Sequence, residues 1–437
     1  MTASSGPSAL GLLRDRRFAK LITSSAVNAF ANQVALLAIP LVAVLTLKAS
    51  PFQVAAVTAL STAAFLLVGL PAGALVDRLR PRAVIAVADG TRSLVALTVP
   101  VAWWAGHLSI WLLYAVAFTM GIANVFGLVA RQSYLPLLVT RSDLTEGNAK
   151  LAGIEQVFRL GGPGLAGQVI AVLTAPFALV VTCASLALSA AAVLWIPESA
   201  PTRRSVRGRR RLIHEVGVGL AFVFGNRLLR AMAISVGWSN LFGLAYSSMM
   251  TIYLANWLRL TPAVIGLVMS VSGAGGIVGA LVARRLSHLV GQGPLMWLSM
   301  LVGMPFLVVL PLVHNVSWVW AAAVAYAIAV CCMVVMNIVQ GTVRQTITPP
   351  ALLGRVSSTF RFLTWGTSPV GAVLGGLLGS SIGPRATLLV AAVGTCVGFV
   401  PIFRSPLRRM REIPAAEGVS RCDARHRQPE SALQEEL

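Results

Sequence analysis

The feature that most constrains this chain is a succession of twelve apolar runs of about 20 residues, each separated from the next by a short polar stretch. One such run can cross a bilayer as a helix, because a helix satisfies its own backbone hydrogen bonds in lipid. Charged residues make up only 11% of the chain, whereas soluble domains carry roughly a quarter. We therefore predict an all-α membrane protein. Its twelve transmembrane helices are expected near residues 21–47, 54–76, 83–105, 109–130, 151–172, 175–196, 231–254, 263–283, 294–313, 317–342, 357–379 and 386–403.

Basic residues are distributed unevenly between the two sides that these spans define. Of the 35 Lys and Arg residues, 29 fall in the termini and loops of one side, while Lys48, Arg259 and Arg385 fall on the other. Loops rich in Lys and Arg stay in the cytoplasm, so we expect both termini there and the protein in the cell membrane. Membrane orientation thus accounts for the net charge of +21, and we expect no nucleic-acid partner.

A basic stretch between the sixth and seventh spans divides the chain near its middle. It contains six arginines between positions 203 and 211 and precedes an amphipathic pattern over 213–224. We interpret it as a tether held inside by charge, with specific contact to anionic lipid as the alternative. The predicted organisation is a cytoplasmic N-terminus (1–20), a six-helix half (21–196), the basic linker (197–230), a second six-helix half (231–404) and a cytoplasmic, disordered tail (405–437).

Two similarities between the halves indicate an internal duplication. Gly73 begins the sequence Gly-Ala-Leu-Val-Asp-Arg at the end of the second span, and Gly279 begins Gly-Ala-Leu-Val-Ala-Arg at the end of the eighth (279 − 73 = 206). Pro163 and Pro369 have the same separation. Equivalent elements in two halves are typical of transporters built from repeats, so we predict two pseudo-symmetric six-helix halves.

These motifs resemble the major facilitator superfamily, in which the loop between helices two and three reads roughly Gly-x-Leu-x-Asp-Arg-x-Gly-Arg-Arg. The arginine and Leu-Pro at the end of the fourth span, and Gly-Pro in the fifth, are similar to the drug- and siderophore-exporter branch, which includes enterobactin and macrolide exporters. The resemblance implies the two-domain major facilitator fold. It also implies that Asp77 helps to latch the halves together on the cytoplasmic side, the alternative being a purely topological charge. The motif and gating residues are Gly73, Asp77, Arg78, Arg82, Arg131, Gly162, Pro163 and Arg344.

Only two acids, Asp89 and Glu155, fall inside predicted spans. A charge at mid-bilayer costs about 2.5–3.5 kcal/mol, so each acid should be paired or face a cavity. Arg92 is three residues from Asp89 and Arg159 four from Glu155, while Arg361 lies 206 positions after Glu155 (361 − 155 = 206). We hypothesise that these five residues form one charged network in the cytoplasmic half of the bundle. Glu155 is the preferred proton carrier, and a static ion-pair cluster that holds the inward gate shut is the alternative.

Polar and aromatic side chains at membrane depth indicate a substrate path. One stripe recurs every four residues on the first span, and a second mixes hydroxyl and aromatic groups on the seventh. The family resemblance adds amides on the fourth and tenth spans, because helices one, four, seven and ten line its central cavity. Such a mixture suits a bulky amphipathic organic molecule, and hydrogen bonding between helices is the alternative. The residues are Ser24, Asn28, Asn32, Asn124, Trp238, Ser239, Phe242, Tyr246, Asn337 and Gln340.

These features favour a secondary active transporter that exports a drug, antibiotic or siderophore-like compound by alternating access, with protons as the coupling ion. An importer or an uncoupled facilitator of the same fold is the main alternative. A membrane-embedded enzyme or a receptor is disfavoured, because the sequence lacks a pattern of catalytic residues and a Gly-x-x-x-x-Gly-Lys motif. We expect no cofactor and no metal.

Overall fold

The computed structural model describes residues 12, 15–76, 79–140, 143–197, 217, 219–349 and 352–412. Nearly all of them are helical, and none of these described residues lies in a strand. The first half contains α1 (Arg16–Leu41) with the π-helical turn η2 (Val42–Thr46), α2 (Pro51–Val76), α3 (Pro81–Trp104), α4 (Ile110–Leu138), α5 (Leu144–Leu173) and α6 (Ala175–Leu194).

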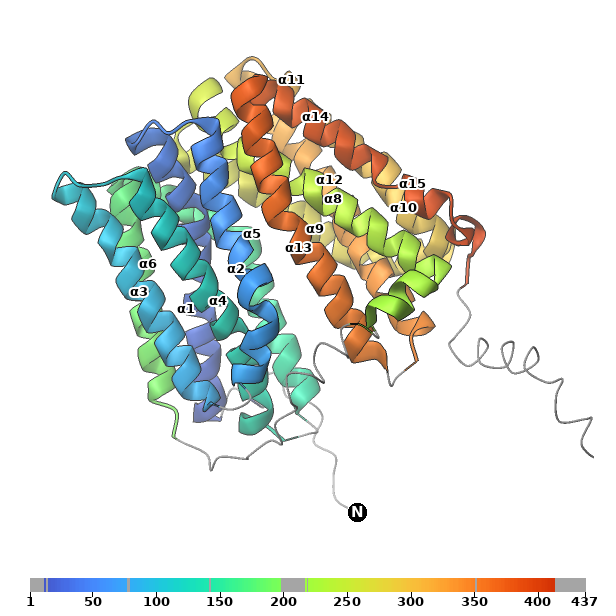
Figure 1. Ribbon diagram of the computed structural model, residues 1–437, viewed down its shortest axis with the longest axis horizontal. Coiled ribbons are helices and arrows are strands. Elements are labelled where there is room, and N and C mark those ends of the chain that lie inside the picture. Colours follow the sequence, from blue (N-terminus) through green and yellow to red (C-terminus); the bar gives the residue numbers. More distant parts are fainter. Residues whose placement is uncertain are drawn as a thin grey trace, which may run out of the picture.

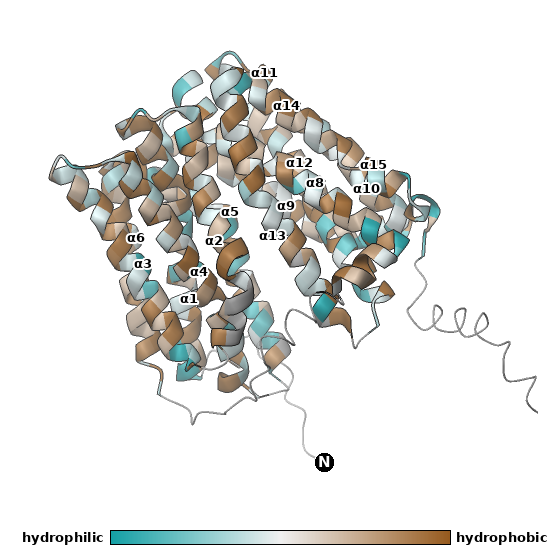
Figure 2. Ribbon diagram, viewed as in Figure 1, coloured by the Kyte–Doolittle hydropathy of each residue, from teal (hydrophilic) through white to brown (hydrophobic). Residues whose placement is uncertain are grey.

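The second half repeats this order (Figure 1). It contains α8 (Arg227–Ile252) with the π-helical turn η3 (Tyr253–Trp257), α9 (Pro262–Val290), α10 (Gln292–Gly303), η4 (Met304–Val308), α11 (Val309–Leu312), η5 (Val316–Trp318), α12 (Val319–Ile347), α13 (Leu353–Ser381), α14 (Gly383–Val397), α15 (Val400–Phe403) and η7 (Pro406–Arg409). Ten helical segments in the described part of the chain are long and apolar enough to cross a membrane. The long helices α5 and α13 complete the two sets of six, and hydrophobic residues predominate along them all (Figure 2). The predicted fold class is confirmed.

Several helices extend past the ends predicted from the apolar runs. We call the end of the bundle that carries Arg16 the Arg16 end, and the opposite one the Lys48 end. At the Arg16 end, α4 continues to Leu138 instead of 130, α9 to Val290 instead of 283 and α12 to Ile347 instead of 342. A helix that leaves the bilayer no longer needs apolar residues, so hydropathy underestimates its length.

The two halves share their local geometry at the Lys48 end. Both α1 and α8 are followed by a π-helical turn and then by a basic residue with positive φ, Lys48 (φ 50°) and Arg259 (φ 50°). A proline then opens the next helix in each half, Pro51 and Pro262. All these pairs are 211 positions apart (259 − 48 = 211). The duplication therefore extends to backbone conformation.

The sequence copy at Gly279 is not an equivalent loop, which corrects the prediction that compared it with Gly73. Gly279 lies inside α9, which continues through the buried Ala283 to Val290. A side chain at Gly279 would come within 2.5 Å of the Cys331 carbonyl oxygen on α12, so glycine permits a close helix crossing there. The shared sequence marks a site of small-residue packing inside α9 in the second half, and the end of α2 in the first.

Two helix pairs make most of the contact between the halves, α5 with α9 and α2 with α13. A Cβ atom at Gly167 would lie 2.9 Å from the Cα of Gly266, and one at Gly376 would lie 2.6 Å from the Cβ of Ala55. Both contacts lie toward the Lys48 end, where small residues allow backbones to approach closely. The halves converge at this end and diverge toward the Arg16 end (Figure 1).

Part of the tail that we predicted to be disordered is ordered. Residues 405–412 fold against α10, and Leu407 is fully buried. The backbone N–H groups of Gln292 and Gly293 donate to the carbonyls of Arg411 and Met410, each at 3.1 Å. These are the first N–H groups of α10, which have no partner within their own helix. The remaining tail and the six linker arginines lie outside the described residues.

Candidate functional site

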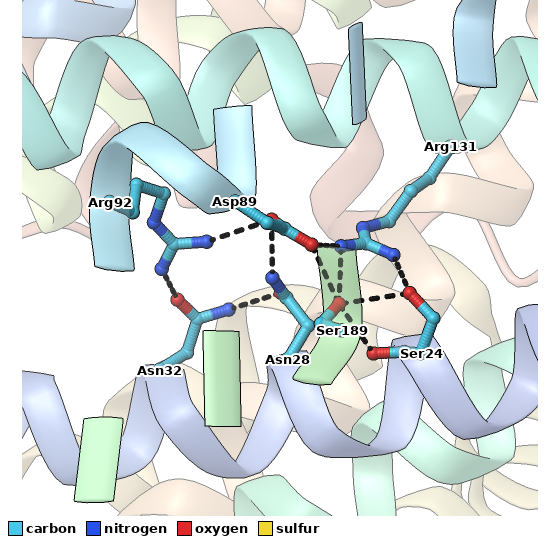
Figure 3. Close-up of polar contacts among 7 residues, drawn as sticks. All are labelled: Ser24, Asn28, Asn32, Asp89, Arg92, Arg131 and Ser189. Carbon is cyan, nitrogen blue, oxygen red and sulfur yellow. Dashed lines mark hydrogen bonds and ion pairs between the residues drawn. The ribbon is translucent and has the colours of Figure 1, made fainter. Parts of the chain in front are cut away.

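Seven polar side chains meet inside the first half and form what we call the Asp89 cluster (Figure 3). They come from four helices: α1, α3, α4 and α6. They lie between about one and a half and four and a half turns from the Arg16 ends of their helices. The members are Ser24, Asn28, Asn32, Asp89, Arg92, Arg131 and Ser189.

The carboxylate of Asp89 is the centre of the cluster and is fully buried. Its Oδ1 accepts a hydrogen bond from Asn28 Nδ2 at 2.9 Å and lies 3.8 Å from a guanidinium nitrogen of Arg92. Its Oδ2 accepts from Ser189 Oγ at 2.6 Å and forms an ion pair with Arg131. Both oxygens are thus surrounded by donors, as a buried carboxylate requires.

The two arginines connect Asp89 to α1. Arg131 also donates to Ser24 Oγ at 2.9 Å, and Arg92 donates to the side-chain oxygen of Asn32. The amide of Asn32 donates in turn to Asn28 Oδ1 at 3.0 Å. Two guanidinium groups face one carboxylate, so the cluster carries one excess positive charge. With a single anion serving both, the loss of Asp89 leaves two cations uncompensated.

The Asp89 cluster differs from the predicted charged network in two ways: two predicted members are absent from it, and one unpredicted arginine belongs to it. Glu155 and Arg159 are exposed on α5, and among the described residues neither has an ion pair or hydrogen bond. The Arg361 side chain lies outside the described residues. Arg131, which the sequence analysis treated as a motif residue outside the spans, is a direct partner of Asp89. Ser189 was missed, because a single serine in an apolar run has no distinguishing pattern.

The polar stripe of the first span faces the interior of its own half. Ser24 is fully buried and Asn28 is 8% exposed, and both are bound to the cluster. We expected these residues to line a passage between the halves, and the structure corrects this. A spacing of four residues identifies a polar helix face but not the surface that it meets.

The predicted face of α8 also packs within its own half. Trp238 Nε1 donates to the Gly394 carbonyl at 2.8 Å, and Phe242 packs against the same glycine. Ser239 packs against Gly398, and the buried Tyr246 donates to the Leu307 carbonyl at 3.0 Å. The partners belong to α14, to Gly398 just after it and to η4, so this face anchors α8 within the second half, a further correction.

A cavity of about 230 Å³ lies in the second half beside α2 of the first. Arg344 lies over the Phe360 ring at 5.1 Å, and Trp365 stacks on Phe65 of α2 at 4.9 Å. The predicted residues Asn337 and Gln340 both line it, whereas Asn124 of α4 is exposed elsewhere. The cavity is lined by Val236, Asn337, Gln340, Gly341, Arg344, Phe360, Thr364 and Trp365.

The remaining motif residues hold helices together within the first half. Arg82 donates to the Leu194 carbonyl and so ties the start of α3 to the end of α6. A side chain at Gly162 would come within 2.5 Å of Gln33 Cγ, and Pro163 lies inside α5. Gly73 lies within α2, while Asp77 and Arg78 lie outside the described residues, so the latch stays a prediction.

A bundle of two six-helix halves related by duplication, with a cavity in the second half beside α2 of the first, is the architecture of a multi-pass membrane transporter. The chain belongs to the Major Facilitator Superfamily, whose family model matches residues 21–368. It is accordingly a transporter and not an enzyme.

Curated relatives and solved structures agree with this family. The chain is 26% identical to "Enterobactin exporter EntS" of Escherichia coli O1:K1 / APEC over 352 residues, which cover 78% of this chain and 81% of that relative. It is 26% identical to the same exporter of Citrobacter koseri over 376 residues, with coverage of 84% and 86%. The nucleoside transporter NupG has a similar structure, with a TM-score of 0.71, 15% identity and coverage of 89% and 99%. The structure of a bacterial homologue of the iron transporter ferroportin in an inward-facing state is also similar, with a TM-score of 0.70 and 16% identity. The match covers 89% of this chain and 98% of that one.

Proposed function

We propose that this transporter exports a bulky amphipathic organic compound, such as a drug, an antibiotic or a siderophore-like metabolite, across the cell membrane. The relatives named as enterobactin exporters support the direction and the substrate class. The observation that carries the proposal is the contact between halves, held at the Lys48 end by α5–α9 and α2–α13 while the halves diverge at the Arg16 end. Such a bundle suits rocking between two states, with access to a central site from alternate sides.

We assign the Arg16 end to the cytoplasm, with both termini there, because most basic residues cluster at that end. The structure then corresponds to an inward-facing state, the state named for one of the similar solved structures. Substrate would enter from the cytoplasm and leave after the halves close at the Arg16 end and part at the Lys48 end.

The substrate site in this proposal is the cavity beside Trp365. It offers amide groups from Asn337 and Gln340, a guanidinium from Arg344 and aromatic groups of Phe360 and Trp365. Aromatic faces bind apolar rings, and the amides and the guanidinium bind acceptor oxygens. A compound with aromatic rings and carbonyl, hydroxyl or carboxylate groups fits this lining.

Proton coupling is assigned to Asp89 instead of Glu155, since Asp89 is the buried acid and Glu155 is exposed. A proton on Oδ2 and the ion pair with Arg131 compete for the same oxygen. Proton binding would release Arg131 from Asp89 and so loosen α4 from α3, while the hydrogen bond from Arg131 to Ser24 would still hold α4 to α1. Export driven by protons requires a group whose affinity for the proton differs between the two states of the transporter.

The proposal is tested by transport in everted membrane vesicles with a panel of fluorescent amphipathic compounds. An energised wild-type sample should accumulate at least one compound, and an uncoupler should abolish the accumulation. In vesicles that contain equal amounts of folded protein, Asp89→Asn should remove gradient-driven accumulation, whereas Glu155→Gln should retain it. Accumulation only in right-side-out vesicles would indicate an importer. Accumulation that is insensitive to the uncoupler would rule out proton coupling.

A further inference from the structure

A second cavity, of about 650 Å³, opens at the Arg16 end of the second half, between the start of α8 and the segment that follows α14. Five arginines line it: Arg227, Arg230, Arg404, Arg408 and Arg409. They come from two parts of the chain that are far apart in sequence. Figure 1 places α15 at the edge of the second half that faces away from the first. The cavity is thus separate from the substrate site and from the Asp89 cluster.

The charges in this cavity have no counterpart in the described part of the chain. No acid lines it, and none of the five arginines has an ion pair with a described carboxylate. Arg227 and Arg230 occupy the first turn of α8, where the helix dipole disfavours cations. All five arginines are exposed, and their like charges around one hollow at a positive helix end attract an anion to it.

The wall of the cavity changes from cationic to apolar along α8. Ala231 and Ile234 lie one turn further into the helix, and Ile234 is 46% exposed. Phe403 and Pro401 form the opposite wall. The Arg408 guanidinium lies 4.6 Å from the centre of the Phe403 ring, which holds one cation in place. A ligand that fills this cavity therefore has an anionic head beside an apolar chain.

We propose that the cavity binds the phosphate group of an anionic membrane phospholipid, with an acyl chain along Ile234. The arginines lie at the end of a membrane-spanning helix, at the depth of lipid headgroups, and guanidinium pairs bind phosphate oxygens with two hydrogen bonds each. A free phosphate would use the arginines but not the apolar wall. This site is distinct from the linker arginines, which lie outside the described residues.

The full-length protein, purified in mild detergent, is titrated with phosphatidylglycerol, phosphatidylcholine or inorganic phosphate and examined by native mass spectrometry. The pocket variant is Arg230→Gln/Arg404→Gln. The matched control is Arg284→Gln/Arg285→Gln, which removes two exposed arginines at the same end of α9. Each lost guanidinium should weaken phosphatidylglycerol binding about fivefold, so the pocket variant should lose roughly 25-fold. Arg230→Lys/Arg404→Lys keeps the charges and should retain most of the binding.

The control variant should bind phosphatidylglycerol as the wild type does, and phosphatidylcholine should bind much more weakly to every variant. An equal loss in the pocket and control variants would overturn the proposal, since it would show unspecific attraction to basic residues. Equal retention of the two lipids would overturn it as well. Displacement of bound lipid by an equal concentration of inorganic phosphate would assign the site to a free anion. Unchanged elution on size exclusion shows that the variants are folded.

Discussion

The Asp89 cluster makes an asymmetric prediction about stability, because one carboxylate serves two arginines. Asp89→Asn keeps the shape of the side chain but removes its charge. It leaves the buried Arg92 and the partly buried Arg131 without an anion. An amide also offers one acceptor oxygen where the carboxylate offers two, and four donors now compete for it.

The expected cost follows from charge balance. Removing one partner of a buried ion pair typically costs 3–5 kcal/mol, and we expect about that much for Asp89→Asn. Arg131→Gln leaves Asp89 with Arg92 at 3.8 Å, Asn28 at 2.9 Å and Ser189 at 2.6 Å. The carboxylate then still has a cation, so this variant should cost only about 1–3 kcal/mol.

The double variant tests the reasoning directly. Asp89→Asn/Arg131→Gln returns the cluster to one excess positive charge, as in the wild type. It should therefore cost less than the sum of the two single variants by about 2 kcal/mol, within the range for groups in direct contact. Glu155→Gln, an exposed acid on α5, should change stability by less than about 0.5 kcal/mol.

The assay is equilibrium unfolding of the purified protein in mixed micelles with increasing dodecyl sulfate, followed by tryptophan fluorescence. Arg131→Gln should be the most stable of the three, and the double variant should be about as stable as Asp89→Asn. If Arg131→Gln is the least stable, or if the double variant costs the full sum of the two, charge balance does not hold this cluster together.

Three further predictions concern packing. Gly266→Val places a side chain against the Pro163 carbonyl oxygen, where a Cβ would lie at 2.4 Å, and it should lower both the melting temperature and the transport rate. Gly153→Val is the control: a Cβ there has nothing within 4 Å, so both quantities should stay unchanged. Tyr246→Phe leaves the Leu307 carbonyl without its donor and should cost about 1–3 kcal/mol in the same unfolding assay, and no measurable loss would contradict that bond. Trp365→Ala removes the stack with Phe65 between the halves and should weaken their contact by about 0.5–1.5 kcal/mol more than Trp365→Phe, measured by unfolding.

The sequence by itself determined the class of the protein. Twelve apolar runs and few charges leave only a helical bundle in lipid, since any other backbone would bury unsatisfied polar groups. The same patterns identified Asp89 and Arg92, because a buried charge is expensive wherever it occurs. Pro163 and the motif at Gly73 placed the chain among major facilitator proteins, which the family match confirms.

Only the tertiary structure decided which helix faces meet. Glu155 and Asp89 have similar sequence surroundings, yet Asp89 is enclosed by α1, α4 and α6 while Glu155 is exposed. Arg131 reaches Asp89 because α4 runs eight residues past its apolar segment (138 − 130 = 8). Helical periodicity determines on which face of its own helix a residue lies. Which neighbouring helix packs against that face depends on contacts between residues that are distant in sequence.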